Sequence, residues 1–206
     1  MMADSAAPEQ TQGIRVRLHP DPGEAATWPV IRRARTDELD AVAELFAPGL
    51  APYRGTDADP LLDAYLADLE NIRPRFDVAE VYLALDGGRP IGSVSFYPDV
   101  RLEGWSNLPA GWSGFRALVV HPDARGSGIG RALLETCIAR TRAVGAPVLG
   151  LHTIEQLADA VRLYERLGFV RCPEFDLRAV DIFPGSYSDA INGSAYKLEL
   201  GTERPD

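Results

Sequence analysis

Cysteine and histidine are scarce in this chain. Its 206 residues include two cysteines, Cys137 and Cys172, and three histidines, His19, His121 and His152. Residues 1–12 lack the basic and apolar segments of a signal peptide. Two cysteines without an export signal favour reduced thiols and a cytoplasmic location. The histidines follow no metal-ligand spacing, so we expect no metal site.

The chain also lacks a long apolar segment and an excess of basic charge. No apolar run approaches the length of a membrane span, so we expect no membrane partner. A net charge of −9 argues against broad binding to nucleic-acid phosphates. It is compatible with a cationic acceptor such as an amine, although acidic surfaces mostly serve solubility. The composition, 46% hydrophobic and 25% charged, is typical of one globular domain with a substantial core.

Periodicity divides the chain into a tail and a mixed α/β domain. Residues 1–28 show no periodicity and are expected to form a flexible N-terminal tail. Residues 29–206 are expected to form a single domain. Alternating and helical apolar patterns predict its elements. In chain order these are a strand at 30–34, helices at 36–46 and 59–69, a hairpin of strands 81–85 and 91–96, an irregular insertion at 98–113, a strand at 115–120, a helix at 131–144, a strand at 148–153, a helix at 156–167, and strands at 169–177 and 195–200 around a loop at 181–194.

Two helix boundaries carry specific signals. Thr36-Asp37 can cap the first predicted helix, and Pro48-Gly49 is expected to end it. Asp59 followed by Pro60 is a favourable start for the second.

A glycine-rich turn lies between a predicted strand and a predicted helix. The apolar residues 115–120 suit a strand, and Gly126, Gly128 and Gly130 follow where a helical pattern begins. Glycine lets backbone N–H groups approach a ligand closely. A helix N-terminus adds unpaired N–H groups and the positive end of its dipole. The segment therefore predicts a phosphate or pyrophosphate site, with Arg125 adding positive charge at its rim.

The spacing of the glycines distinguishes between three known classes of phosphate-binding loop. No Lys-Ser or Lys-Thr follows the glycines, so a nucleotide-hydrolysing P-loop is unsupported. The dinucleotide pattern G-x-G-x-x-G is not met, because the third glycine comes one residue too early. The pattern Arg-x-x-Gly-x-Gly is matched by residues 125–130 and resembles the acyl-CoA-binding motif of the GCN5-related N-acetyltransferases (GNAT). The segment 163–169 resembles the second signature of that family. The resemblance covers about Val30 to Leu200.

The resemblance implies a fold and an activity. The fold is α/β, with a mixed, mostly antiparallel central sheet flanked by helices, the acyl-CoA N-acyltransferase fold. The implied enzyme moves an acetyl group from acetyl-CoA, its co-substrate, directly to the primary amine of a small molecule, without a metal. Backbone groups of Leu118, Val119 and Val120 are implied to hold the pantetheine arm. The pyrophosphate is implied to lie on the backbone amides of Arg125, Gly126, Ser127, Gly128, Ile129, Gly130 and Arg131.

Acetyl transfer requires a deprotonated amine, stabilisation of an oxyanion and a proton for the thiolate. Tyr164 matches the tyrosine that acts as general acid in many family members, while an aromatic residue on an apolar helical stripe is also typical of a core. His152 is a candidate base because its ordinary pKa suits the task; alternatively it is hydrogen-bonded and fixes the strand end. Glu103 or a water chain on backbone carbonyls are other candidate bases. His121 is expected to be a turn residue.

Several features leave alternatives open. Leu157 stands where many family members carry asparagine, so a non-catalytic acyl-CoA-binding or sensing module is an alternative function. A peptide or protein acetyltransferase is a further alternative.

Trp105 and Trp112 either line an acceptor pocket or cover the sheet. Exposed strand edges are compatible with a homodimer. A group of acidic residues either attracts a cationic substrate or forms a solvated face: Asp57, Asp59, Asp63 and Asp68.

Overall fold

The computed structural model describes residues 29–56, 59–178 and 192–201. The predicted tail at 1–28, Asp57 and most of the predicted loop at 181–194 lie outside the described residues. No helix formed by the described residues has both the length and the apolar character needed to cross a bilayer.

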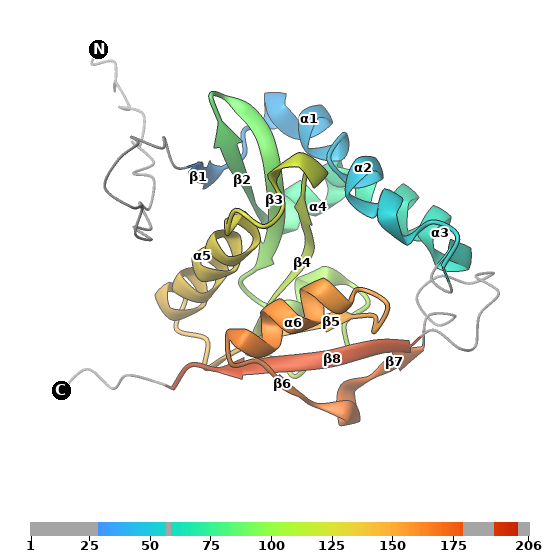
Figure 1. The fold of residues 1–206 in the computed structure, drawn as a ribbon. Coiled ribbons are helices and arrows are strands. Elements are labelled where there is room, and N and C mark those ends of the chain that lie inside the picture. Colours follow the sequence, from blue (N-terminus) through green and yellow to red (C-terminus); the bar gives the residue numbers. More distant parts are fainter. Residues whose placement is uncertain (1–28, 57–58, 179–191, 202–206) are drawn as a thin grey trace, which may run out of the picture.

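The strands form one eight-stranded sheet in the order β1-β2-β3-β4-β5-β8-β6, with β7 paired to β8 (Figure 1). Among the described strands, β4 and β5 are parallel and the other pairings are antiparallel, which confirms the predicted mixed, mostly antiparallel sheet. The strands are β1 (Val30–Arg33), β2 (Glu80–Asp86), β3 (Arg89–Tyr97), β4 (Ser113–Val120), β5 (Val148–Thr153), β6 (Val170–Arg171), β7 (Leu177–Arg178) and β8 (Asn192–Glu199).

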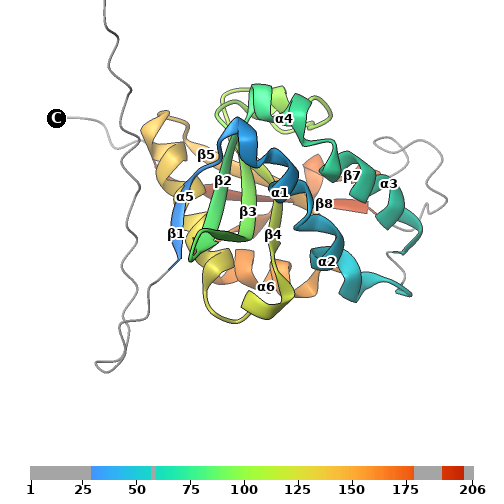
Figure 2. The ribbon, with the colours of Figure 1, turned by 90° about the horizontal axis from the view of Figure 1, so that it is seen from above.

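Helices cover both faces of the sheet, as Figures 1 and 2 show. On one face lie α5 (Ile129–Ala143) and α6 (Ala158–Arg166). On the other lie α1 (Leu39–Ala43), α2 (Phe46–Leu50), α3 (Asp59–Glu70) and α4 (Ile72–Val78).

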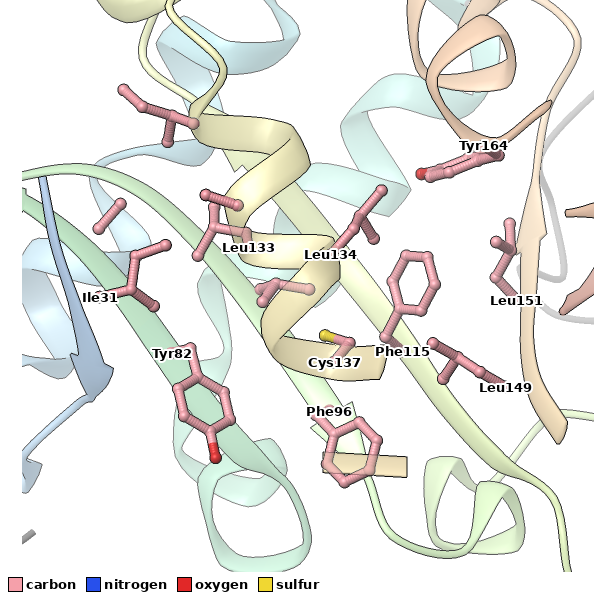
Figure 3. Packing of buried hydrophobic residues seen from close by; sticks show 14 of the residues in the cluster. Ile31, Tyr82, Phe96, Phe115, Leu133, Leu134, Cys137, Leu149, Leu151 and Tyr164 are labelled. Carbon is pink, nitrogen blue, oxygen red and sulfur yellow. The ribbon is translucent and has the colours of Figure 1, made fainter. Parts of the chain in front are cut away.

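The alternation of a strand explains the two cores. Successive side chains of β2 point to opposite faces, so Tyr82 packs with α5 while Val81 and Leu83 pack with α1 and α4. Because both faces are covered, the interior of β2 is apolar at consecutive positions. Figure 3 shows the first cluster, in which Leu133 and Cys137 of α5 lie over the sheet.

The predicted helix at 36–46 is broken. Residues Thr36–Glu38 form a 3₁₀ turn, α1 ends at Ala43 and α2 starts at Phe46. The predicted cap is wrong, because the residue before the turn is Arg35, whose backbone N–H donates to Glu38 Oε2 at 2.8 Å. The predicted stop is wrong too, because Pro48 lies in the first turn of α2, where a helix tolerates proline.

Two further differences from the predicted elements lie near prolines. Helix α4 was not predicted, and Pro74 lies in its first turn, where a helix tolerates proline. The strand expected at 169–177 is two short strands, β6 and β7, separated by a 3₁₀ turn at Pro173–Phe175. Proline cannot donate to a sheet ladder, which explains the interruption. The hairpin of β2 and β3 is confirmed.

Candidate active site

Strands β4 and β5 pair over a short length only. Ser113 lies opposite Leu149 and Gly114 opposite Gly150, and no further register pair joins the two strands. Beyond these pairs the strands diverge, as Figure 1 shows. The carboxyl half of β4 therefore has an edge of backbone N–H and C=O groups without a strand partner, and an extended ligand could pair with it.

A β-bulge distorts β4 where it pairs with β3. Ser93 lies opposite Val119 and Ser95 opposite Arg116, so Ala117 and Leu118 together face one residue of β3. Ala117 has φ of +55° and is the only non-glycine residue with a positive φ among the described residues. Such an outlier in the middle of a strand is typical of a functional site.

The glycine-rich turn forms the mouth of a cleft of about 490 Å³. Gly126 and Gly128 have φ of +76° and +86°, and Gly128 is the N-cap of α5. The first N–H groups of α5 have no intrahelical partners, so this end of the helix suits an anion. The predicted cofactor residues on the cleft wall are Leu118, Val119, Val120, Arg125, Gly126, Gly128, Ile129, Gly130 and Arg131.

Two of the predicted residues have structural contacts of their own. Ser127 does not line the cleft, and its Oγ donates to the carbonyl of Ala124 at 2.6 Å. Arg125 donates from Nη2 to the carbonyl of Gly49 at 2.5 Å. Both contacts hold the turn in place, and the second connects it to α2.

A smaller cavity of about 110 Å³ adjoins the cleft. Ala117 and Leu118 of the bulge, Leu157 and Ala160 line both spaces. The two spaces therefore meet beside the bulge, and molecules in the cleft and in the cavity could react there. Polar and aromatic side chains of the smaller cavity include Tyr65, Trp105, Arg116, His152, Thr153 and Tyr164.

Tyr164 is a core residue and also lines the smaller cavity. It is 5% exposed, and the centre of its ring lies 5.8 Å from the centre of the Phe115 ring. Figure 3 shows both side chains in the cluster. Burial raises the pKa of its hydroxyl well above the ordinary value. The phenol therefore stays protonated near neutral pH, as a proton donor must.

His152 has one ring nitrogen bonded and the other without a partner. Nε2 lies 2.9 Å from the carbonyl oxygen of Phe175, which can only accept, so Nε2 carries the hydrogen. Burial lowers the pKa of the imidazole, which keeps it neutral at pH 7. Nδ1 then carries a lone pair and has no hydrogen-bond partner among the described residues. His152 thus fixes the strand end and also offers a base.

The other candidate bases lie away from the cavity. Glu103 has a side chain only 4% exposed, lines neither space and lies behind Arg116, with Oε1 3.7 Å from Nε. Burial raises its pKa to about 7. His121 accepts the backbone N–H of Asp123 on Nδ1 at 3.3 Å, as expected of a turn residue.

The two tryptophans of the insertion have different positions. Trp105 lines the smaller cavity, whereas Trp112 packs its ring against Phe175 at 5.6 Å and lines neither space. Of the acidic group, Asp59 and Asp63 pair with Arg54.

Sequence reasoning missed Arg116, which lines the cavity and pairs with Asp68. An arginine inside an apolar strand was the available signal. No group of three potential metal-binding side chains occurs among the described residues.

The model of the acetyltransferase (GNAT) family matches residues 39–169. The chain belongs to this family. A mycothiol acetyltransferase of Geodermatophilus obscurus is 37% identical over 110 residues, which is 50% of this chain and 32% of that protein. An aminoalkylphosphonate N-acetyltransferase of Salmonella typhimurium is 31% identical over 142 residues, covering 68% of this chain and 83% of that protein.

The fold agrees with this GNAT assignment. A structure of the Salmonella typhimurium protein yncA with its cofactor acetyl-CoA has a TM-score of 0.57 and 23% identity, and covers 86% of this chain and 98% of that chain. The present chain spans between 32% and 49% of the length of the mycothiol acetyltransferases it matches.

Proposed function

We propose that this chain is an acetyl-CoA-dependent N-acetyltransferase that moves an acetyl group to the primary amine of a small molecule. The observation that carries the proposal is the meeting of two spaces at the bulge in β4. One space has a glycine-rich turn at a helix N-terminus and an unpaired strand edge, and the other has a tyrosine hydroxyl and a neutral imidazole.

The larger cleft fits the chemistry of acetyl-CoA, which supplies an activated acetyl thioester when bound. The backbone of Leu118, Val119 and Val120 offers hydrogen bonds along the edge of β4 to the amides of the pantetheine arm. The backbone N–H of Arg125 donates to the carbonyl of Pro122 at 3.2 Å, so the amides from Gly126 to Arg131 are the ones that offer N–H groups to its pyrophosphate. Backbone recognition of this kind does not depend on Leu157, where the family often has asparagine.

His152 is the proposed general base. His152 lines the smaller cavity, its neutral imidazole has a lone pair on Nδ1, and the carbonyl of Phe175 fixes the ring through Nε2. A base in this position accepts the proton that the amine loses as it attacks. Because the pKa of His152 is lowered, the base stays available in mildly acidic solution.

Tyr164 is the proposed general acid. Its hydroxyl is protonated at neutral pH because burial raises its pKa, and its ring is held by Phe115 and Phe169. Donation of this proton to the departing thiolate makes the thiol a better leaving group. Backbone N–H groups beside the bulge are the donors available to the developing oxyanion.

The size of the second cavity favours a small acceptor. About 110 Å³ accommodates a compact head group rather than a folded peptide segment. The mycothiol and aminoalkylphosphonate acetyltransferases named above are relatives whose names also describe small acceptors. Both lines of evidence support a small-molecule acceptor over a protein.

Replacement of Tyr164 by phenylalanine tests the proposal. We expect Tyr164→Phe to lower kcat by at least tenfold while the Kd for acetyl-CoA changes by less than twofold, because only the proton donor is lost. Turnover is measured as thiol release and affinity by calorimetry. Tyr196→Phe is the matched control, because Tyr196 is 5% exposed in the same aromatic cluster and lines neither space.

The outcomes separate the alternatives. Unchanged turnover in Tyr164→Phe excludes the tyrosine as the acid. Acetyl-CoA binding without turnover of any amine by the unaltered protein favours a binding or sensing module.

A further inference from the structure

Buried polar atoms without hydrogen-bond partners gather around the smaller cavity. Four described residues that line it carry one such atom each: Trp105 Nε1, Arg116 Nε, His152 Nδ1 and Thr153 Oγ1. Buried polar groups in proteins are almost always hydrogen-bonded, and an unmade bond costs about 1–3 kcal/mol. Arg116 Nε lies 3.7 Å from Glu103 Oε1, whereas for the other three atoms a polar ligand in the cavity is a candidate partner.

The side chains of Arg116 and Trp105 form one wall. Arg116 is 8% exposed, and its guanidinium carbon lies 5.0 Å from the centre of a Trp105 ring. Nη2 of Arg116 donates to Asp68, whereas Nε has no hydrogen bond. A guanidinium and an indole N–H can only donate. The group that they bind must therefore accept hydrogen bonds.

The charges around Arg116 leave the wall positive. Asp68 and Glu103 are the acidic neighbours, and Arg75 is a second guanidinium in the same cluster. Since burial raises the pKa of Glu103 to about 7, this carboxyl is half protonated near neutral pH. Arg116 is the one charged side chain among the described residues that line the cavity, whereas Arg75, Asp68 and Glu103 line neither space. A purely cationic acceptor is disfavoured beside this wall, in spite of the net negative charge of the protein.

We propose that the acceptor carries an anionic oxyacid group, a carboxylate or a phosphonate, in addition to its amine, and that Arg116 and the Trp105 N–H bind this group. The planar fork of arginine suits the paired oxygens of either group. With the anion on this wall, the amine is left for His152, which lines the same cavity. This substrate class rests on the proposed acetyltransferase activity.

Matched acceptors test the inference. The first pair is β-alanine and β-alanine amide, and the second is 2-aminoethylphosphonate and its diethyl ester; each pair keeps the amine and removes the anion. We expect kcat/KM to be at least tenfold higher for the anionic member of at least one pair. The pair with the larger ratio identifies the oxyacid. Ratios near one, or a preference for the neutral members, overturn the inference while leaving the acetyltransferase activity intact.

Binding without turnover separates this inference from the proposed function. Propionate and propylphosphonate lack an amine, and propionamide is the neutral control. In the presence of coenzyme A, calorimetry should detect one of the two anions at least tenfold more tightly than propionamide. Anion binding without acetylation of any amine contradicts the proposed function but supports the anion site. Equal or absent binding of all three contradicts the anion site.

Two variants test whether Arg116 and Trp105 bind the anionic group. Arg116→Gln should abolish the preference for anions, but it leaves Asp68 and Glu103 without their cation and can impair folding. Trp105→Phe keeps an aromatic ring, removes the N–H donor and makes the side chain smaller. We expect it to lower the ratio of kcat/KM for anionic over neutral acceptors about threefold. An unchanged preference in Trp105→Phe excludes the indole, and an unchanged preference in a folded Arg116→Gln protein overturns the inference.

Discussion

His152 illustrates how a single hydrogen bond determines the chemistry of a residue. The carbonyl of Phe175 fixes the hydrogen on Nε2, and burial keeps the ring neutral. A lone pair on Nδ1 follows from these two facts together. The sequence indicated a titratable residue at the end of a strand, but not this tautomer, because Phe175 lies 23 residues further along the chain.

The pH dependence of turnover tests the role of His152. Because its pKa is lowered, we expect kcat/KM to lose the contribution of the base only as the pH falls through a value below 6.5. His152→Gln should lower kcat/KM at least tenfold at pH 7.5 and remove that acidic transition. Both proteins are measured with the same acceptor, so the ionisation of its amine affects both pH profiles equally. The ratio of the two kcat/KM values at each pH therefore reports the ionisation of His152 alone.

His121→Gln is the control for this measurement. His121 accepts a backbone N–H in a turn and lines neither cavity. Its replacement should leave the profile unchanged. An acidic transition that persists in His152→Gln would show that another group is the base.

Arg116 shows the limit of residue-level prediction. Its role in the cavity was not predicted, since the strand around it is apolar and no charged partner is near in sequence. Its partners, Asp68 on α3 and Glu103 in the insertion, come close only in the folded chain. Tyr164 was identified through a motif in its own helix, so local sequence sufficed for it.

At the scale of elements, the site is made by a break in pairing and a turn. The loss of pairing after Gly114 exposes one edge of β4, and two glycines with positive φ position the start of α5. The strand, turn and helix were predictable because they are contiguous and have strong patterns. The bulge at Ala117 was not predictable, because it reflects the register between two strands.

Replacement of Gly126 by alanine tests the turn. A Cβ at Gly126 meets no atom within 4 Å, but φ of +76° is unfavourable for alanine by about 1–2 kcal/mol. We expect the turn to relax in the free protein and the Kd for acetyl-CoA to rise about five- to tenfold. Calorimetry measures this change.

Gly88→Ala provides the matched control. Gly88 lies in the turn between β2 and β3, has φ of +88° and equally open surroundings. The same strain there should lower the melting temperature without changing the Kd. A Kd unaffected by Gly126→Ala would mean that the amides of the turn do not hold the phosphates.

At the scale of the molecule, a sheet with helices on both faces supports a cavity where its two halves diverge. The apolar periods of the main strands and helices predicted a mixed α/β domain, and the family resemblance implied the mostly antiparallel sheet flanked by helices. The sequence did not predict the buried charges beneath the insertion. Glu103, Arg116 and Asp68 come from three separate elements, and only the assembled fold buries them together.

The buried carboxyl of Glu103 makes stability depend on pH. Its pKa is about 7 in the folded protein and about 4.5 when exposed, so the folded state binds the extra proton between these values. Its contribution is therefore favourable below pH 4.5 and is lost as the pH rises through 7. Glu103→Gln should stabilise the protein by about 1–3 kcal/mol at pH 8 relative to its effect at pH 5.5.

Thermal unfolding at the two pH values checks this prediction. Glu174→Gln is the control, because Glu174 is exposed. This replacement should change the free energy of unfolding by the same amount at both pH values. A difference for Glu103→Gln that does not depend on pH would mean that Glu103 is ionised as in an exposed site.

On the proposed function, the cleft beside β4 delivers an acetyl group to a small amine in the adjoining cavity. The most direct test is to incubate the protein with acetyl-CoA and a panel of small amines and to identify the products by mass spectrometry. We expect an N-acetylated amine in amounts equal to the coenzyme A released, and at least tenfold less product with Tyr164→Phe. Coenzyme A release without any N-acetylated amine, or no release with the entire panel, would contradict the proposed function.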